Sequence, residues 1–216
     1  QEYDLAGAAT GVVEHARLLG PHRVRPGDAV VALASSGLHA NGYSLVRAVL
    51  RTARWSLDRH VPDLGRTLGE ELLEPTRVYA ADLRALIRAE GLDVHALSHV
   101  TGGGLAANLA RVLPPGVLAT LDRASWTPAP VFDLVRQLGQ VPVPDLERTL
   151  NLGVGFVVVL PATQTDRAVE ICRARGIPAW LLGEVSARAP QVDVDVTRGA
   201  KGVQGGSVQL VGSHPA

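Results

Sequence analysis

The stretch DAVVALASSGLHANGYSLVR, residues 28–47, decides the fold. Its first part is a short run of small and β-branched apolar residues, which predicts a buried strand at 29–34. Its last part opens a segment at 43–54 whose apolar residues recur with helical spacing. A buried strand followed closely by an amphipathic helix is the unit of which α/β folds are built, so we expect an α/β domain.

The rest of the chain continues this alternation. Glu74-Pro75-Thr76 predicts the start of a helix, because the fixed φ of proline suits a first helical turn. The glycine-rich stretch 197–206 predicts a loop before a last strand, and residues 3–14 predict a strand that finishes a preceding domain. Further strands are expected at 92–100, 117–121, 154–160, 180–185 and 208–211, and further helices at 105–113, from Pro130, at 145–150 and at 166–175.

Composition narrows the class of protein. The 216 residues are 46% hydrophobic, and 21 basic residues balance 21 acidic ones, which indicates a soluble globular protein without affinity for nucleic acid. The longest apolar run, 154–160, is too short to span a membrane, and the single Cys172 cannot form an intrachain disulfide, so we expect a cytoplasmic protein. Because the chain contains no methionine, we expect it to be part of a longer polypeptide.

The loop SSGLHANG at 35–42 is the first candidate site. It lies where the first predicted strand passes into the first predicted helix, which is where open α/β sheets place their ligands. Ser35, Ser36 and Gly37 would let the backbone approach an anion closely, while His39 and Asn41 add side-chain hydrogen-bonding groups. The alternative is a polar turn that only caps the helix.

The stretch HVTGGG at 99–104 is the second candidate site. Thr101 and three glycines, Gly102, Gly103 and Gly104, again separate a predicted strand from a predicted helix. The start of a helix offers free N–H groups and a positive dipole end, and glycines remove the Cβ atoms that would obstruct a phosphate. The alternatives are a flexible connection or tight packing of the helix on the sheet.

Other residues give weaker signals. Asn151 is expected either to face a ligand or to end a helix, and Asp4 is a possible nucleotide or metal ligand. No cluster has metal-ligand spacing, so the metal ligands stay unknown. Cys172 and Trp126 are expected to pack in or beside the core, and the remaining histidines to be exposed; these are His15, His22, His60 and His214.

Four segments resemble phosphoribosylformylglycinamidine cyclo-ligase, the aminoimidazole ribonucleotide synthetase of purine biosynthesis. They are residues 28–47, 74–79 (EPTRVY), 99–113 (HVTGGGLAANLARVL) and 147–156 (ERTLNLGVGF), in the order of that family. The resemblance implies a C-terminal domain at 28–216 with a mixed sheet flanked by helices. It also implies that residues 1–27 are the tail of an otherwise missing N-terminal ATP-binding domain.

The resemblance further implies a reaction and its partners. The expected reaction is the ATP-dependent closure of formylglycinamidine ribonucleotide to aminoimidazole ribonucleotide, with ATP and Mg²⁺ as cofactors and a homodimer as the full-length assembly. His39 and Asn41 would be catalytic. Ser35, Ser36, Gly37, Thr101, Gly102, Gly103, Gly104 and Asn151 would bind substrate or phosphate.

Two alternatives stay open. The chain is either a binding module that holds a phosphorylated ribonucleotide without catalysis of its own, or a related ATP-dependent enzyme such as formylglycinamidine ribonucleotide synthase. Much of the ATP and Mg²⁺ site of the family lies in the N-terminal domain, so the isolated fragment is expected to be inactive.

Overall fold

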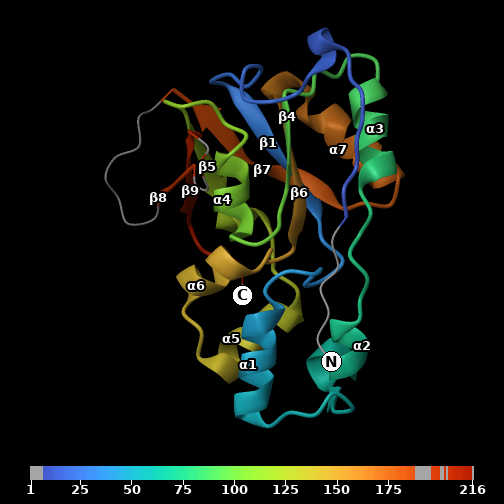
Figure 1. Cartoon of the computed structure of the whole chain (residues 1–216), viewed down its shortest axis with the longest axis vertical. Helices are drawn as coiled ribbons and strands as arrows, with labels where there is room; N and C mark the ends of the chain where they lie inside the picture. The colour runs from blue at the N-terminus through green and yellow to red at the C-terminus, as the bar shows by residue number, and fades with distance from the viewer. Residues whose placement is uncertain (1–6, 188–195, 200–201, 203, 216) are drawn as a thin grey trace.

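A computed structural model describes residues 7–187, 196–199, 202 and 204–215. Its centre is a curled seven-stranded mixed sheet flanked by helices, as the sequence predicts (Figure 1). The strands, in their order across the sheet, are β4 (Ala96–His99), β6 (Val154–Pro161), β1 (Asp28–Ala34), β7 (Ala179–Ser186), β5 (Leu118–Asp122), β9 (Ser207–Val211) and β8 (Val196–Arg198).

Strands β1 and β6 are interior strands of the sheet, and their composition explains why. Both consist largely of valine, leucine and alanine and are buried on both faces. They pair antiparallel, with Ala32 opposite Val157, and β4 and β7 pair antiparallel on their outer sides. Among the described strands, β5 and β9 are the neighbours that run parallel.

Helices cover both faces of this sheet. On one face α4 (Gly104–Ala110) packs against β4, β8 and β9, and its Leu105 and Leu109 enter the core there. On the other face α7 (Thr165–Ala174) packs against β1 and β7 beside α3 (Ala80–Arg88), and Cys172 and Leu86 are buried there. Two layers of helices therefore sandwich the sheet.

A helical lobe lies beyond the carboxyl end of β1 (Figure 1). It has its own apolar cluster, to which Leu38, Val46 and Phe132 belong. Its smallest helix, α2, begins with a capping box formed by Thr67 and Glu70. The elements of the lobe are α1 (Tyr43–Ala53), β2 (His60–Val61), η2 (Pro62–Leu64), β3 (Arg66–Thr67), α2 (Leu68–Leu72), α5 (Pro130–Gly139) and α6 (Val143–Thr149).

The start predicted for the helix at Glu74-Pro75-Thr76 was wrong. Residues 74–79 form an extended connector that leads from the lobe to α3, which begins only at Ala80. The fixed φ of proline also suits extended chain, so the proline signal was ambiguous. The strand predicted at 92–100 is likewise shorter and covers only β4.

Two expectations at the chain ends also need correction. Thr197 and Arg198, expected in a loop, belong to β8, and residues 7–14, expected in a strand, have no regular structure and are exposed. Short 3-10 turns complete the fold at η1 (His15–Arg17), η3 (Arg123–Ser125) and η4 (Ala162–Gln164). None of the helices in the described ranges is both long and apolar enough to cross a membrane.

Candidate functional site

The two candidate loops emerge side by side because β1 and β4 flank β6 and both run antiparallel to it. Ala34, at the end of β1, pairs with Val154, and His99, at the end of β4, pairs with Phe156. Both loops therefore leave the sheet over the first residues of β6. They approach each other closely: a Cβ atom built on Gly102 would lie 3.5 Å from Asn41 Oδ1.

The first loop is held in shape by Asn151. The Nδ2 group of this buried side chain donates to the carbonyl oxygens of Gly37 (2.9 Å) and Leu38 (3.2 Å). Its Oδ1 accepts from Ser35 Oγ (3.1 Å) and from the N–H of Gly153 (2.8 Å). These bonds give Asn151 a positioning function, and its predicted contact with a ligand stays a prediction.

His39 is the most unusual side chain of the first loop. It is 5% exposed and has a left-handed backbone with φ of 59°, a conformation that is uncommon for a residue with a side chain. Its Nε2 accepts a hydrogen bond from the N–H of Ser36 at 3.1 Å, so the proton of the neutral ring is on Nδ1. Among the described residues, Nδ1 has no hydrogen-bond partner.

The surroundings of His39 keep its ring neutral. Burial, followed by the positive fields of His99 and Arg77, lowers its pKa from 6.5 to about 4. An imidazole with this pKa is uncharged at pH 7, so it can donate a hydrogen bond through Nδ1 but carries no imidazolium proton to give away. A neutral ring suits hydrogen bonding better than acid catalysis, and the expected catalytic role of His39 stays a prediction.

Four aromatic rings gather around this point. Tyr79 and His99 lie 6.1 and 6.4 Å from the His39 ring centre, and His99 stacks on Phe156 at 5.5 Å. The hydroxyl of Tyr79 donates to the carbonyl oxygen of Ala34 at 2.8 Å, which closes the end of β1. Gly155 makes this possible, because a Cβ there would lie 1.8 Å from Tyr79 Oη.

The glycines of the second loop have a packing reason. Gly104 has φ of +73°, and a Cβ on it would lie 1.7 Å from the carbonyl oxygen of Glu147 in α6. Gly103 has φ of +106°, while Thr101 donates its hydroxyl to Asn108 Oδ1. The tight packing considered above therefore accounts for Gly104. The predicted contact of Gly102, Gly103 and Gly104 with an anion stays a prediction.

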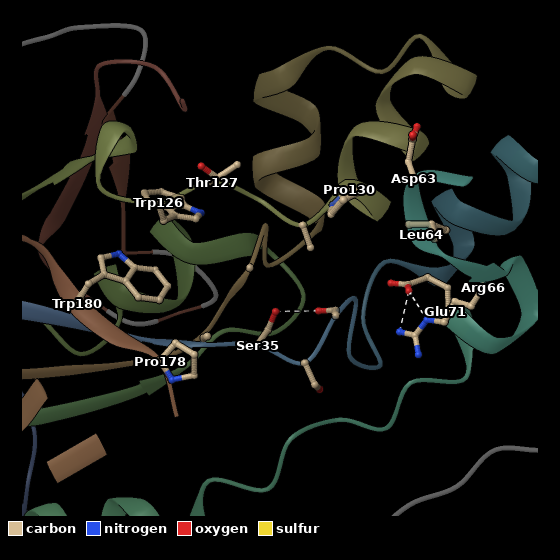
Figure 2. A pocket seen from close by; sticks show the side chains of 15 residues that line it. Ser35, Asp63, Leu64, Arg66, Glu71, Trp126, Thr127, Pro130, Pro178 and Trp180 are labelled. Atoms are coloured by element: carbon tan, nitrogen blue, oxygen red, sulfur yellow. Dashed lines mark hydrogen bonds and ion pairs between the residues drawn. The ribbon is translucent and has the colours of Figure 1, made fainter. Parts of the chain in front are cut away.

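A cavity of about 520 Å³ opens between the sheet and the lobe (Figure 2). Ser35, Ser36 and Gly37 line it on the side of the first loop, and Trp126 and Trp180 form an aromatic wall. On the lobe side Arg66 is paired with Glu71 (2.7 Å). The second loop does not line this cavity, so the two loops meet at Asn41 and Gly102 rather than around this pocket.

The remaining candidates lie elsewhere. Asp4 lies outside the described residues. Within the described ranges, no group of three or more His, Cys, Asp or Glu side chains is placed to hold a metal ion. His214 was expected to be exposed, which was wrong: its side chain is 17% exposed and meets the Trp126 ring edge-on at 4.5 Å. Trp126 and Cys172 are buried, as predicted.

Comparison with known proteins identifies the family. Residues 25–195 match the family described as AIR synthase related protein, C-terminal domain. This chain belongs to that family. A putative phosphoribosylformylglycinamidine cyclo-ligase from Streptomyces fradiae is 58% identical over 166 residues, which are 76% of this chain and 90% of the relative. The cyclo-ligase of Symbiobacterium thermophilum is 50% identical over 194 residues, 88% of this chain and 54% of the relative.

Solved structures place the AIR synthase related chain in the same fold. Thiamine-monophosphate kinase from Stenotrophomonas maltophilia K279a superposes with a TM-score of 0.55 at 18% sequence identity. The match covers 94% of this chain and 56% of the kinase chain. The hydrogenase maturation protein HypE of E. coli superposes with a TM-score of 0.55 at 18% sequence identity, and the match covers 90% of this chain and 49% of the HypE chain. The chain thus spans about half the length of these structures and of the Symbiobacterium relative.

Sequence reasoning missed three residues that shape the site of this AIR synthase related chain. Arg77 and Tyr79 lie in the segment 74–79, where the sequence predicts a helix start and gives no sign that their side chains reach His39. Asn108 donates to the carbonyl oxygens of Thr101 and Gly104 and so fixes the second loop. An asparagine on the otherwise apolar helix 105–113 was the available signal for Asn108, because a buried amide needs partners.

Proposed function

We propose that this chain is the C-terminal half of a phosphoribosylformylglycinamidine cyclo-ligase. The observation that carries the proposal is the identity of 50–58% with proteins of that name. The reaction would close formylglycinamidine ribonucleotide to aminoimidazole ribonucleotide in purine biosynthesis. ATP, when bound, would supply the phosphoryl group that turns the formyl oxygen into a leaving group, and the amidine nitrogen would then form the C–N bond.

In this proposal the first loop binds and orients the substrate. Neutral His39 would donate Nδ1–H to a phosphoryl or formyl oxygen, and Asn41, which is partly exposed beside Gly102, would contact the reacting amide. Ser35, Ser36 and Gly37 would face the ligand from the wall of the 520 Å³ cavity, whose volume suits a ligand of nucleotide size. Hydrogen-bond donors fixed before the reaction stabilise developing negative charge without reorganising.

The second loop would contribute main-chain N–H groups near Gly102. The ligands of Mg²⁺ are not assigned, and no step here is routed through it. We further propose, from the family, that the complete protein is a cytoplasmic homodimer and that residues 1–27 lead out of its ATP-binding domain.

The test is a substrate panel on the complete reading frame that contains this sequence. Formation of aminoimidazole ribonucleotide from formylglycinamidine ribonucleotide and ATP is expected. Phosphorylation of thiamine monophosphate, or amidation of formylglycinamide ribonucleotide, without that product would reject the cyclo-ligase proposal in favour of a related enzyme.

The non-catalytic alternative rests on the length of the chain, which is about half that of its full-length relatives. A thermal-shift titration of the isolated chain separates the two ideas. Stabilisation by ribonucleotide but not by ATP with Mg²⁺, together with an inactive complete protein, would favour the binding module.

A further inference from the structure

A cavity of about 540 Å³ lies at the end of the molecule away from the helical lobe. It lies between the linker at 16–23, which precedes β1, and the segment 87–94, which leads from the last turn of α3 towards β4. Figure 1 shows η1 and the end of α3 opposite the lobe. The described residues that line this cavity include none from the first or the second loop, so it is separate from the candidate site.

The cavity carries positive charge. Its lining contains three arginines, and Asp93 is the one acidic residue among the described residues that line it. The carboxylate of Asp93 is already engaged by Arg23, with which it forms an ion pair, and by His95 Nε2 at 3.1 Å. Arg17 and Arg88 are exposed and have no ion pair within the described part of the chain. Two guanidinium groups are therefore available to an anionic ligand.

The remainder of the lining is largely apolar. Val94 is buried, Leu19 and Leu92 are partly buried, and Ile87 is 45% exposed. The first three pack in or against the apolar cluster between the sheet and α3, so the fold fixes this floor. The linker wall is fixed as well, because Gly20 donates its N–H to the carbonyl oxygen of His95 at 2.9 Å. The cavity thus combines mobile positive side chains with a rigid apolar floor.

This lining indicates the class of ligand. A guanidinium group offers parallel N–H donors that match the oxygens of a phosphate, so two such groups on one cavity suit a phosphate dianion. Inorganic phosphate alone would leave the apolar floor uncovered. The volume is within the range of about 300–1,000 Å³ that is typical of small-molecule sites. The cavity therefore suits a phosphate ester with a flat or apolar organic body.

We propose that this cavity binds a phosphomonoester of nucleotide size. Arg17 and Arg88 hold the phosphate, and Leu19, Ile87 and Leu92 contact the organic body. The site goes beyond the proposed function, because it lies at the other end of the sheet and does not depend on which reaction the two loops support. Since one wall is the linker at 16–23, a bound ligand would hold this linker against α3.

Methyl NMR tests where the ligand binds, because the chain contains three isoleucines, at 87, 171 and 177. Adenosine 5′-monophosphate, a phosphomonoester with a flat ring, is the probe, and the whole chain is labelled at its isoleucine methyl groups. We expect the signal of Ile87 to shift during the titration and that of buried Ile177 to stay in place.

Substitution of the two arginines tests the phosphate contact. Arg17→Gln and Arg88→Gln should each weaken binding of adenosine 5′-monophosphate about tenfold, the loss expected for a charge-assisted hydrogen bond. Both side chains are exposed and lack ion pairs, so the variants should fold, and unchanged signals of Ile171 and Ile177 verify this. Arg84→Gln is the matched control: it removes an exposed charge from α3 outside the cavity and should leave the affinity unchanged.

Two simpler ligands separate the parts of the site. Adenosine lacks the phosphate and inorganic phosphate lacks the organic body, so both should bind more weakly than adenosine 5′-monophosphate. Equal binding of either compound would overturn the proposal, as would equal affinity of wild type and both arginine variants. An Ile87 signal that the nucleotide does not move would also overturn it. Each of these results can occur while the complete protein makes aminoimidazole ribonucleotide, so failure here is distinguishable from failure of the proposed function.

Discussion

Asn151 holds Gly37 across 114 positions of sequence, through an Nδ2–H···O bond of 2.9 Å. This bond is one of four that the buried amide makes, and together they join the start of β6 to the loop after β1. We expect Asn151→Ala to destabilise the chain by about 2–3 kcal/mol, because it leaves buried donors and acceptors unpaired. Urea unfolding measures this. Asn41→Ala, which removes a partly exposed amide, should cost less than about 1 kcal/mol, and equal midpoints for Asn151→Ala and wild type would contradict the expectation.

Gly155→Ala should displace the Tyr79 ring. The new methyl would lie 1.8 Å from Tyr79 Oη and 2.7 Å from His39 Cε1, so the substitution should cost about 1–3 kcal/mol. Gly11→Ala, with open space around its Cα, is the matched control. Combining Gly155→Ala with Tyr79→Ala should recover part of the loss, because the second change removes the obstruction. Strict additivity of the two losses would show that the rings do not obstruct the methyl.

His39 should make stability depend on pH. Its pKa is about 4 in the folded chain and 6.5 in an unfolded one, so the unfolded state binds the proton first as pH falls. Protonation of His39 in the unfolded state therefore does not lower the free energy of unfolding above pH 6.5. Between pH 6.5 and pH 4 it lowers that free energy progressively, by at most about 3 kcal/mol. Unfolding free energies at pH 7 and 4.5 should therefore differ less for His39→Gln than for wild type. An NMR titration that puts the His39 pKa near 6.5 would refute this.

His95 should contribute strongly to the stability of the fold at the start of β1, at the end of the sheet opposite the candidate site. It is buried, and its two ring nitrogens lie 2.7 Å from Asp28 and 3.1 Å from Asp93. His95→Phe should destabilise the chain by about 3 kcal/mol or more, because the buried Asp28 loses its partner. The double variant Asp28→Val, His95→Phe should recover part of that loss in urea unfolding. Asp93→Asn, at a half-exposed carboxylate, is the control and should have a small effect.

Cys172 offers a simple probe of the native fold. The thiol is fully buried against the sheet, and burial raises its pKa to about 11. A thiol reagent at pH 8 should therefore label the folded chain slowly and the urea-unfolded chain rapidly. Labelling at equal rates in both states would mean that α7 does not stay packed on β1 and β7.

Strands and helices whose own apolar pattern shows how they are buried could be predicted from the sequence. The valine run at 157–159 marks β6 because a central strand is apolar on both faces, and the two loops follow from strands that pass directly into helices. Contacts between distant segments could not be predicted. The packing of His214 on Trp126, the pairing of β8 with β9 and the bond from Asn151 to Gly37 each join residues without any local signal.

The candidate site shows the same limit. His39 was identified by its place after a strand, but its neutral ring depends on burial and on the fields of His99 and Arg77, and its ring lies beside Tyr79 and Gly155; all of these come from other elements. A proline at 75 that suits both helix and extended chain concealed two of these residues within a wrongly predicted helix start.

The extended connector at 74–79 is bonded to the first loop and to the strand that leads into it: Ser36 Oγ donates to the carbonyl oxygen of Pro75, and Tyr79 Oη donates to that of Ala34 at the end of β1. A library that varies these six residues would consequently select for loop geometry. Substitutions in the connector would therefore change turnover by moving the first loop, although the residues of that loop themselves stay unchanged.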